Sequence, residues 1–161
     1  MEIKNKFKAF ILKKNEEESL IHSIEEINKS FLMDGNVVVK VEFSSFNYKD
    51  GLAITGKLPV IKKYPMIPGV DFSGVVVDSK NNDFKIKDKV ILNGWGVGEK
   101  HFGGFSQYAR LESKWLIKLP KRFSFEEAMV IGSAGYTASL CVLKLLERIN
   151  NKKEDKIIVT G

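Results

Sequence analysis

The chain has 161 residues, 43% of them hydrophobic, which is enough for one packed domain and the beginning of a second. Its net charge of +6 comes mainly from lysines scattered along the sequence, which argues against a nucleic-acid-binding stripe and suits either a small polyanionic ligand or an ordinary solvated surface. The single cysteine, Cys141, excludes an internal disulfide, and no continuous apolar run reaches the roughly 20 residues that cross a membrane, so we expect a cytoplasmic protein.

The first third of the chain predicts strands and one short helix. Residues 7–14 have the pattern of a strand, and "NEEESLIHSIEEI" predicts a turn followed by a second strand or a short helical piece. Residues 35–46 follow an Asp-Gly turn and alternate valine and phenylalanine with polar residues, which indicates a strand. This period of two breaks in "NYKDGLAITG", where we predict a short helix between Asn47 and Gly56.

The middle of the chain predicts further short strands, within residues 64–77, 84–92, 104–111 and 114–120. Turns rich in Gly, Pro and Asp join them, and no regular helices intervene. Many short strands connected in this way predict an antiparallel barrel or sandwich.

After Pro120 the pattern changes from strands to helices. In "SFEEAMVIGSAGYTASLCVLKLLERI", Ser124 and two following glutamates begin one helix, and a second helix carries apolar residues at spacings of three and four. The polar turn "NNKKED" follows. The final "KIIVTG" has the pattern of a buried parallel strand that leads to Gly161, as a strand does before a phosphate-binding turn.

Five short motifs occur in a fixed order along the chain: "NYKD", "PGVDFSG", "KDKV", "GGFSQYA" and "AGYTA". In this order they resemble the medium-chain dehydrogenase/reductases. The longer segments "SSFNYKDGLAITGK", "PMIPGVDFSGVV", "GWGVGEKHFGGFSQYAR" and "GSAGYTASLCV" narrow the resemblance to the YhdH-type quinone oxidoreductases, a group that includes acrylyl-CoA reductases using NADPH. The resemblance covers roughly residues 5–161.

This resemblance implies a mainly β fold with some helix. A GroES-like β-barrel domain would occupy residues 1–122, and residues 123–161 would hold the linking helices and first strand of a truncated Rossmann domain. In the family a glycine-rich turn after that strand binds the cofactor pyrophosphate, so Gly161 would be its first glycine. The resemblance also implies NADPH as the cofactor and a homodimer for the full-length parent.

The segment "NYKDG" is the best site candidate, because in related reductases it lies over the nicotinamide end of the cofactor and the substrate. The resemblance therefore assigns Asn47 and Tyr48 to catalysis, and Tyr48, Asp50 and Gly51 to cofactor binding. An amide and a phenol donate hydrogen bonds, which suits this task. The alternative is structural, with Asn47 capping a helix and Asp50 completing a capping box, and the two roles are compatible.

Thr137 is a further cofactor candidate, because a threonine in "GYTA" approaches the nicotinamide in the family. It would stand at the start of a helix, where an ordinary N-terminal hydroxyl is the alternative. The loop "GWGVGEKHFGGF", with five glycines in twelve residues, could wrap an adenine or a thioester, or could be a tight barrel loop. We interpret His101 as a turn residue and Cys141 as a core residue on the apolar face of its helix.

The same resemblance bears on metal binding. Zinc-dependent members of the superfamily have a cysteine near the position of Asn47 and "GHE" where this chain has Gly69, Val70 and Asp71. Zinc needs three or four N, S or O ligands, so we predict that no metal is bound.

The predicted function is that of a zinc-independent NADPH-dependent reductase, which delivers hydride to the C=C bond of an α,β-unsaturated thioester and converts acryloyl-CoA to propionyl-CoA. Tyr48 or Asn47 would stabilise the charge on the thioester oxygen, and lysines near the pocket mouth would hold the CoA phosphates. A quinone is the alternative substrate, and a non-enzymatic binding module is the alternative class if the chain ends at Gly161. We expect the 161 residues alone to be inactive, with neither nucleic acid nor a membrane as partner.

Overall fold

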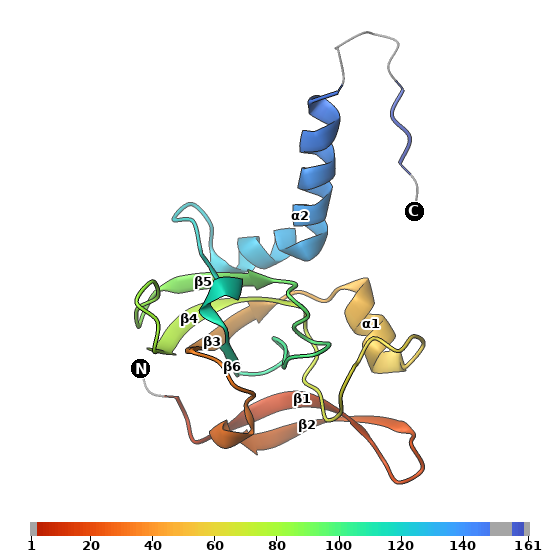
Figure 1. Ribbon diagram of the computed structural model, residues 1–161, viewed down its shortest axis with the longest axis vertical. Coiled ribbons are helices and arrows are strands. Elements are labelled where there is room, and N and C mark those ends of the chain that lie inside the picture. Colours follow the sequence, from red (N-terminus) through yellow and green to blue (C-terminus); the bar gives the residue numbers. More distant parts are fainter. Residues whose placement is uncertain (1–2, 149–155, 160–161) are drawn as a thin grey trace.

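The computed structural model describes residues 3–148 and 156–159, and Figure 1 shows a β-rich body from which one long helix extends. The strands are β1 (Lys6–Lys14), β2 (Leu20–Asn28), β3 (Val37–Ser44), β4 (Asp71–Ser79), β5 (Lys89–Asn93), β6 (Tyr108–Leu111) and β7 (Ile117–Lys118). The helices are α1 (Tyr48–Thr55) and α2 (Phe125–Leu146), with short 3-10 turns at Lys29–Phe31 and Ser113–Trp115. The mainly β fold with a few helices agrees with the sequence prediction.

Two antiparallel sheets form the body. Strands β1 and β2 make a hairpin paired along its whole length, which decides that the second segment is a strand and not a helix. The other five strands lie in the order β6-β3-β4-β5-β7. Backbone hydrogen bonds from Phe10 N to Phe105 O (2.8 Å) and from Leu12 N to Met66 O (2.7 Å) connect the hairpin to segments beside the larger sheet, giving the barrel-like arrangement that the sequence predicts.

The core has two main clusters, one on each side of β3. Val38 belongs to the cluster shared with the β1–β2 hairpin, together with Phe7 and Leu12. Val37 and Val39 belong to the other cluster, against Phe72 and Leu92 among others. The start of β3 is therefore buried on both faces, which explains why three valines follow one another there.

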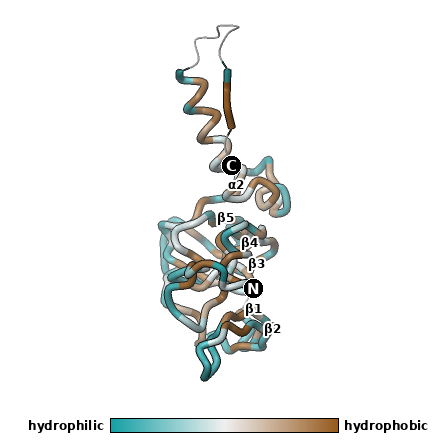
Figure 2. The backbone as a smooth tube through the Cα atoms, turned by 90° about the vertical axis from the view of Figure 1, so that its right-hand side faces the viewer, coloured by the Kyte–Doolittle hydropathy of each residue, from teal (hydrophilic) through white to brown (hydrophobic). Residues whose placement is uncertain are grey.

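Helix α2 consists of two helical segments separated at Gly132, whose φ of 50° and ψ of −162° are not helical. The first segment, which Ser124 caps, packs on the sheet, where Ala128 and Met129 are buried with Leu119. The second leaves the sheet, and Figure 2 shows hydrophobic residues along it. The two predicted helices are thus present, joined by a bend.

The prediction that Cys141 is a core residue is wrong, because this cysteine is exposed on the second segment of α2. Apolar neighbours such as Leu143 and Leu146 are exposed at 59% and 63%. By length and composition α2 is also apolar enough to cross a membrane, and only 11% of its most apolar stretch is buried. The helix is, however, broken at Gly132. Gly, Ser and Thr residues interrupt the apolar residues of α2, so the sequence shows no continuous apolar run there.

The strand predicted in "KIIVTG" is also absent from the described residues. Residues 156–159 have no regular secondary structure, and Ile157, Ile158 and Val159 are 57%, 84% and 90% exposed. A parallel strand needs neighbours on both sides, and the described residues supply none. Gly161, a predicted cofactor residue, lies outside the described residues.

Candidate active site

The buried carboxylate of Asp71, the first residue of β4, connects three separate segments of the chain. It accepts hydrogen bonds from Ser45 Oγ (2.8 Å), Asn47 Nδ2 (3.0 Å) and Ser133 N (2.7 Å), and a short one from Ser133 Oγ. Asp71 itself is 0% exposed. The carboxylate thereby ties the end of β3, the N-terminus of α1 and the second segment of α2 to one point.

Gly132 allows α2 to reach this carboxylate. A Cβ atom at Gly132 would lie 3.0 Å from Asp71 Oδ2 and 3.0 Å from Ser45 Oγ, which is tighter than ordinary contact. Its positive φ is also a conformation that residues with side chains rarely adopt. The bend in α2 and the approach of Ser133 to Asp71 therefore both depend on this glycine.

Asp50 is a second buried carboxylate, in the first turn of α1. It accepts hydrogen bonds from the backbone N–H groups of Asn47 (2.9 Å), Gly69 (3.1 Å) and Val70 (3.2 Å). Burial raises the pKa of Asp50 above its usual value, and the three backbone donors oppose that shift. The bond from Asn47 N completes the capping box, as the structural alternative predicts, and the bonds from Gly69 and Val70 fix the start of α1 against the segment before β4. Its contact with a cofactor stays a prediction.

Asn47 and Tyr48 stand side by side in the sequence but differ in what they can offer a ligand. The Asn47 amide nitrogen donates to Asp71 and, at 3.3 Å, to Ser45 Oγ, so its two N–H groups are already used. Tyr48 is 84% exposed, and no hydrogen bond involves its phenol among the described residues. Of the two predicted catalytic residues, Tyr48 is the one with an available donor. Gly51, in the next turn, is half-buried beside the Phe46 ring.

Thr137 is not at the start of a helix, as the sequence analysis expects. The second segment of α2 begins after Gly132, and Thr137 lies one turn inside it, exposed. The N–H group at the start of this segment is that of Ser133, which Asp71 already binds. Thr137 can therefore offer a ligand its hydroxyl but no free helix N-terminus.

A cleft of about 420 Å³ reaches Gly132 from the side of β5 and β7. Aromatic side chains line much of it, among them Trp95, Trp115 and Tyr136, and Asn93 stands at its wall. The Asn93 amide nitrogen is buried and has no hydrogen-bond partner among the described residues. An unpaired buried donor beside an aromatic cleft is suited to a carbonyl or amide oxygen of a ligand.

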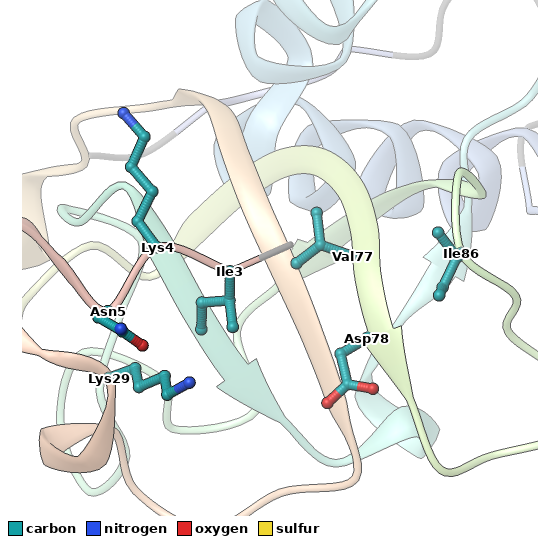
Figure 3. Close-up of a pocket in the computed structure, with 7 residues that line it drawn as sticks. All are labelled: Ile3, Lys4, Asn5, Lys29, Val77, Asp78 and Ile86. Carbon is teal, nitrogen blue, oxygen red and sulfur yellow. The ribbon is translucent and has the colours of Figure 1, made fainter. Parts of the chain in front are cut away.

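A larger groove, of about 710 Å³, lies elsewhere (Figure 3). Lys29 points toward Asp78, which lies near the other end of β4 from Asp71, while Lys4 points away from it. Because the groove contains charges of both signs and is remote along β4 from the Asp71 cluster, we do not assign the chemistry to it.

Residues 33–121, more than half of the chain, match the family of alcohol dehydrogenase GroES-like domains. The chain belongs to this family. This is the domain that the sequence motifs predict, and it places the chain among the medium-chain dehydrogenase/reductases.

Three curated relatives of this GroES-like protein are similar over nearly its whole length. Acrylyl-CoA reductase AcuI of Ruegeria pomeroyi is 40% identical over 96% of this chain, and a provisionally named AcuI of Escherichia coli is 43% identical over 95%. YhfP of Bacillus subtilis, provisionally named a quinone oxidoreductase, is 37% identical over 96%. The aligned part is 47% of each relative, so the chain spans about half the length of the curated relatives that it matches.

Two solved structures have the same fold. The yhdH oxidoreductase of Salmonella enterica in complex with NADP superposes with a TM-score of 0.84 and 46% identity, over 87% of this chain and 43% of that one. The yhfP protein of Bacillus subtilis with NAD bound superposes with a TM-score of 0.85 and 36% identity, over 94% and 45%.

Three positions, 47, 70 and 71, correspond to the zinc ligands of zinc-dependent relatives. Two of them, Asn47 and Val70, carry no side chain that typically binds zinc. Asn47 uses its amide nitrogen internally and Val70 is apolar, while Asp71 is surrounded by donors. In the described ranges no group of three or more His, Cys, Asp or Glu could hold a metal ion. His101 Nε2 donates a 2.7 Å hydrogen bond to Arg110 O, and the ring packs edge-on against Trp115. The absence of a bound metal stays a prediction for elemental analysis.

The sequence analysis missed Asp71, Ser45, Ser133 and Asn93. Asp71 carried a usable signal, because an acid directly before the apolar run of β4 is either paired or functional. Its partners had none, because Ser45 and Ser133 reach it from residues 26 and 62 positions away. Only the fold brings them together.

Proposed function

We propose that this chain is the N-terminal part of a zinc-independent NADPH-dependent reductase, which reduces the C=C bond of an α,β-unsaturated thioester and converts acryloyl-CoA to propionyl-CoA. The observation that carries the proposal is the exposed phenol of Tyr48, the residue that follows Asn47, whose amide Asp71 binds. The two relatives named acrylyl-CoA reductase support it, at 40% and 43% identity. The whole enzyme would be a cytoplasmic homodimer.

The described residues fit the nicotinamide end of such a cofactor. Tyr48 and Thr137 carry exposed hydroxyl groups, and Asn93 has a buried amide nitrogen without a partner. Tyr48, Gly51 and Thr137 would contact this end, and Gly161 would begin the turn that binds the pyrophosphate. When bound, the cofactor supplies a hydride for the β-carbon of the substrate. The solved neighbours with NADP or NADPH bound support this choice.

Tyr48 would act on the thioester oxygen. As the β-carbon gains a hydride, the electron pair of the C=C bond moves toward the carbonyl, and negative charge develops on its oxygen as an enolate. A phenol that donates a hydrogen bond there stabilises the transition state by about 3 kcal/mol in comparable sites. A proton from solvent or from a protein group then completes the product at the α-carbon.

The Asp71 cluster would position this donor without touching the substrate. Through Asn47 it fixes the residue directly before Tyr48, and through Ser133 it fixes the segment of α2 that carries Thr137. A group that is held by its neighbours loses less entropy when it binds a transition state. Asp71 is therefore a positioning residue in this proposal.

A quinone is the second candidate substrate, and the aromatic cleft at Gly132 favours it. Trp95 and Trp115 could stack on a flat ring, and Tyr136 could bind a ring oxygen. The relationship to YhfP of Bacillus subtilis, at 37% identity, supports the same alternative.

Parallel kinetics of the longer protein would decide between the two substrates. We expect kcat/KM with NADPH to be larger for acryloyl-CoA than for a soluble quinone such as a benzoquinone, with propionyl-CoA as the product. A larger kcat/KM for the quinone would make the quinone reductase the correct assignment. Replacing NADPH by NADH in the same assay tests the cofactor preference.

A further inference from the structure

A small pocket outside the Asp71 cluster combines apolar side chains with two lysines. It has a volume of about 200 Å³ and lies between the 3-10 turn after β2, the segment before β4 and the glycine-rich loop. Phe31, Met33 and Phe102 form much of its apolar lining. Phe31 is 37% exposed and stacks on Phe102 with ring centroids 5.2 Å apart, so an aromatic surface is available at the pocket.

Two lysines, Lys63 and Lys100, line the same pocket. Within the part of the chain that the structure describes, neither ammonium group forms an ion pair. Glu99, the residue before Lys100, is instead paired with Lys49. An aromatic pocket with two unpaired cations suits a flat ring that carries negative charge.

The pocket is connected to the candidate active site through a short series of contacts. Lys49, the residue after Tyr48, forms its ion pair with Glu99, the residue before Lys100. The Glu99 carbonyl accepts a 2.9 Å hydrogen bond from the N–H of Lys62, the residue before Lys63. The backbone segments that carry the two pocket lysines are thus hydrogen-bonded to each other, and Glu99, next to Lys100, is paired with Lys49 in the first turn of α1.

The size of the pocket limits what it can hold. Whole ligands of drug size usually occupy roughly 300–1,000 Å³, so this pocket suits one ring system of a longer molecule. CoA has such a ring, an adenine, next to a 3′-phosphate and a pyrophosphate, and a flexible pantetheine arm separates them from the thioester.

We infer that Phe31, Lys63 and Lys100 bind the adenosine 3′-phosphate end of a CoA thioester, with the adenine against Phe31 and the phosphates at the two lysines. This inference rests on the proposed function and names the part of the chain that selects CoA esters over simple enones. The pantetheine arm would run from this pocket toward Tyr48.

Binding of CoA to the 161-residue chain tests the inference without any need for turnover. We expect CoA and adenosine 3′,5′-bisphosphate to bind saturably in isothermal titration calorimetry, with shifts of the Phe31 and Phe102 ring signals in NMR spectra. Lys63→Glu and Lys100→Glu should each weaken both ligands on the order of tenfold. Lys121→Glu, which makes the same charge change at an exposed lysine between β7 and α2, should leave them unchanged.

Three results would overturn the inference: no saturable binding of CoA, equal binding of CoA by the lysine variants, or equal binding of 5′-AMP, which lacks the 3′-phosphate. These results are distinguishable from failure of the proposed function. If Lys63→Glu and Lys100→Glu left the turnover of acryloyl-CoA unchanged, the proposed function would hold and only the CoA pocket would be wrong. If CoA bound at the pocket but the protein did not reduce acryloyl-CoA, the pocket would hold and the proposed function would be wrong.

Discussion

Asp71 is surrounded by hydrogen-bond donors from three parts of the chain. The hydroxyls of Ser45 and Ser133, the Ser133 N–H and the Asn47 amide nitrogen all point at its two oxygens. A carboxylate can accept all of them, whereas an amide would place its own N–H groups against some of these donors. At the scale of single residues, Asp71 therefore holds the segments of the candidate site together, and the phenol of Tyr48, the residue after Asn47, is exposed.

We expect Asp71→Asn to destabilise the fold by ~2–3 kcal/mol, because it leaves buried donors unpaired. Urea unfolding followed by circular dichroism measures this change. Asp78→Asn is the matched control, since Asp78 is an exposed acid on the same strand and its substitution should change stability by less than ~0.5 kcal/mol. Equal stabilities of Asp71→Asn and the parent would show that the cluster does not hold the segments together.

Tyr48→Phe should lower kcat/KM of the longer protein for acryloyl-CoA by about 100-fold, because it removes the donor to the developing oxyanion. The dissociation constant of NADPH, from fluorescence titration, should stay near the parent value. Tyr64→Phe is the control, as Tyr64 lies beside Lys14, outside the Asp71 cluster. Unchanged turnover would reduce Tyr48 to a surface residue, and weaker NADPH binding at equal turnover would make it a cofactor contact.

At the scale of elements, two devices shape the site: the bend of α2 and the glycine-rich loop. Gly132 lets α2 change direction over Asp71. In the loop, a Cβ atom at Gly103 would lie 2.3 Å from Gly69 O, so the loop packs directly on the segment before β4. The glycines thus make a tight loop, as one of the two sequence interpretations has it, while Lys100 and Phe102 from the same loop line the CoA pocket that we infer.

Gly132→Ala should cost about 1–3 kcal/mol of stability, because alanine is strained at positive φ and its methyl group would meet Asp71 and Ser45. Gly135→Ala, three residues further on in a helical conformation, should stay within about 1 kcal/mol of the parent. Thermal unfolding of both variants measures the difference. If the two substitutions lowered the stability equally, the bend of α2 would not depend on glycine at position 132.

The helix α1 shows what local sequence can predict. Asn47 and Gly56 mark its ends because capping and a left-handed C-cap involve only nearby residues, and the structure has both. Non-local features were not predictable in this way. The Asp71 cluster needs contacts between distant segments. Cys141 would be buried, and residues 156–159 would form a strand, only with neighbours that the described residues do not contain.

At the scale of the whole molecule, the described residues divide into a well-packed β body and an unpacked apolar helix. Leu140, Val142 and Leu145 lie on the second segment of α2 and are 40–54% exposed. Burial of each such side chain is worth roughly 1.5–3 kcal/mol, so this surface calls for a covering partner. The Rossmann domain of the proposed enzyme would supply it, and the predicted division between residues 1–122 and 123–161 stays a prediction.

Limited proteolysis of the 161-residue chain should therefore remove the second segment of α2 first and leave the β body intact. NADPH should give no protection and no micromolar binding, because the pyrophosphate turn would follow Gly161. Mass spectrometry of the fragments locates the cuts. Early cleavage within β3 or β4, or micromolar affinity for NADPH, would contradict this division of the molecule.

Isotope transfer in the longer protein tests the reductase assignment most directly. NADPH with deuterium at both C4 positions of the dihydronicotinamide should yield propionyl-CoA with one deuterium at the β-carbon, and the hydrogen added at the α-carbon should come from solvent. Mass spectrometry and NMR of the product locate the label. A product without deuterium at the β-carbon, or no propionyl-CoA from acryloyl-CoA and NADPH, would contradict the assignment.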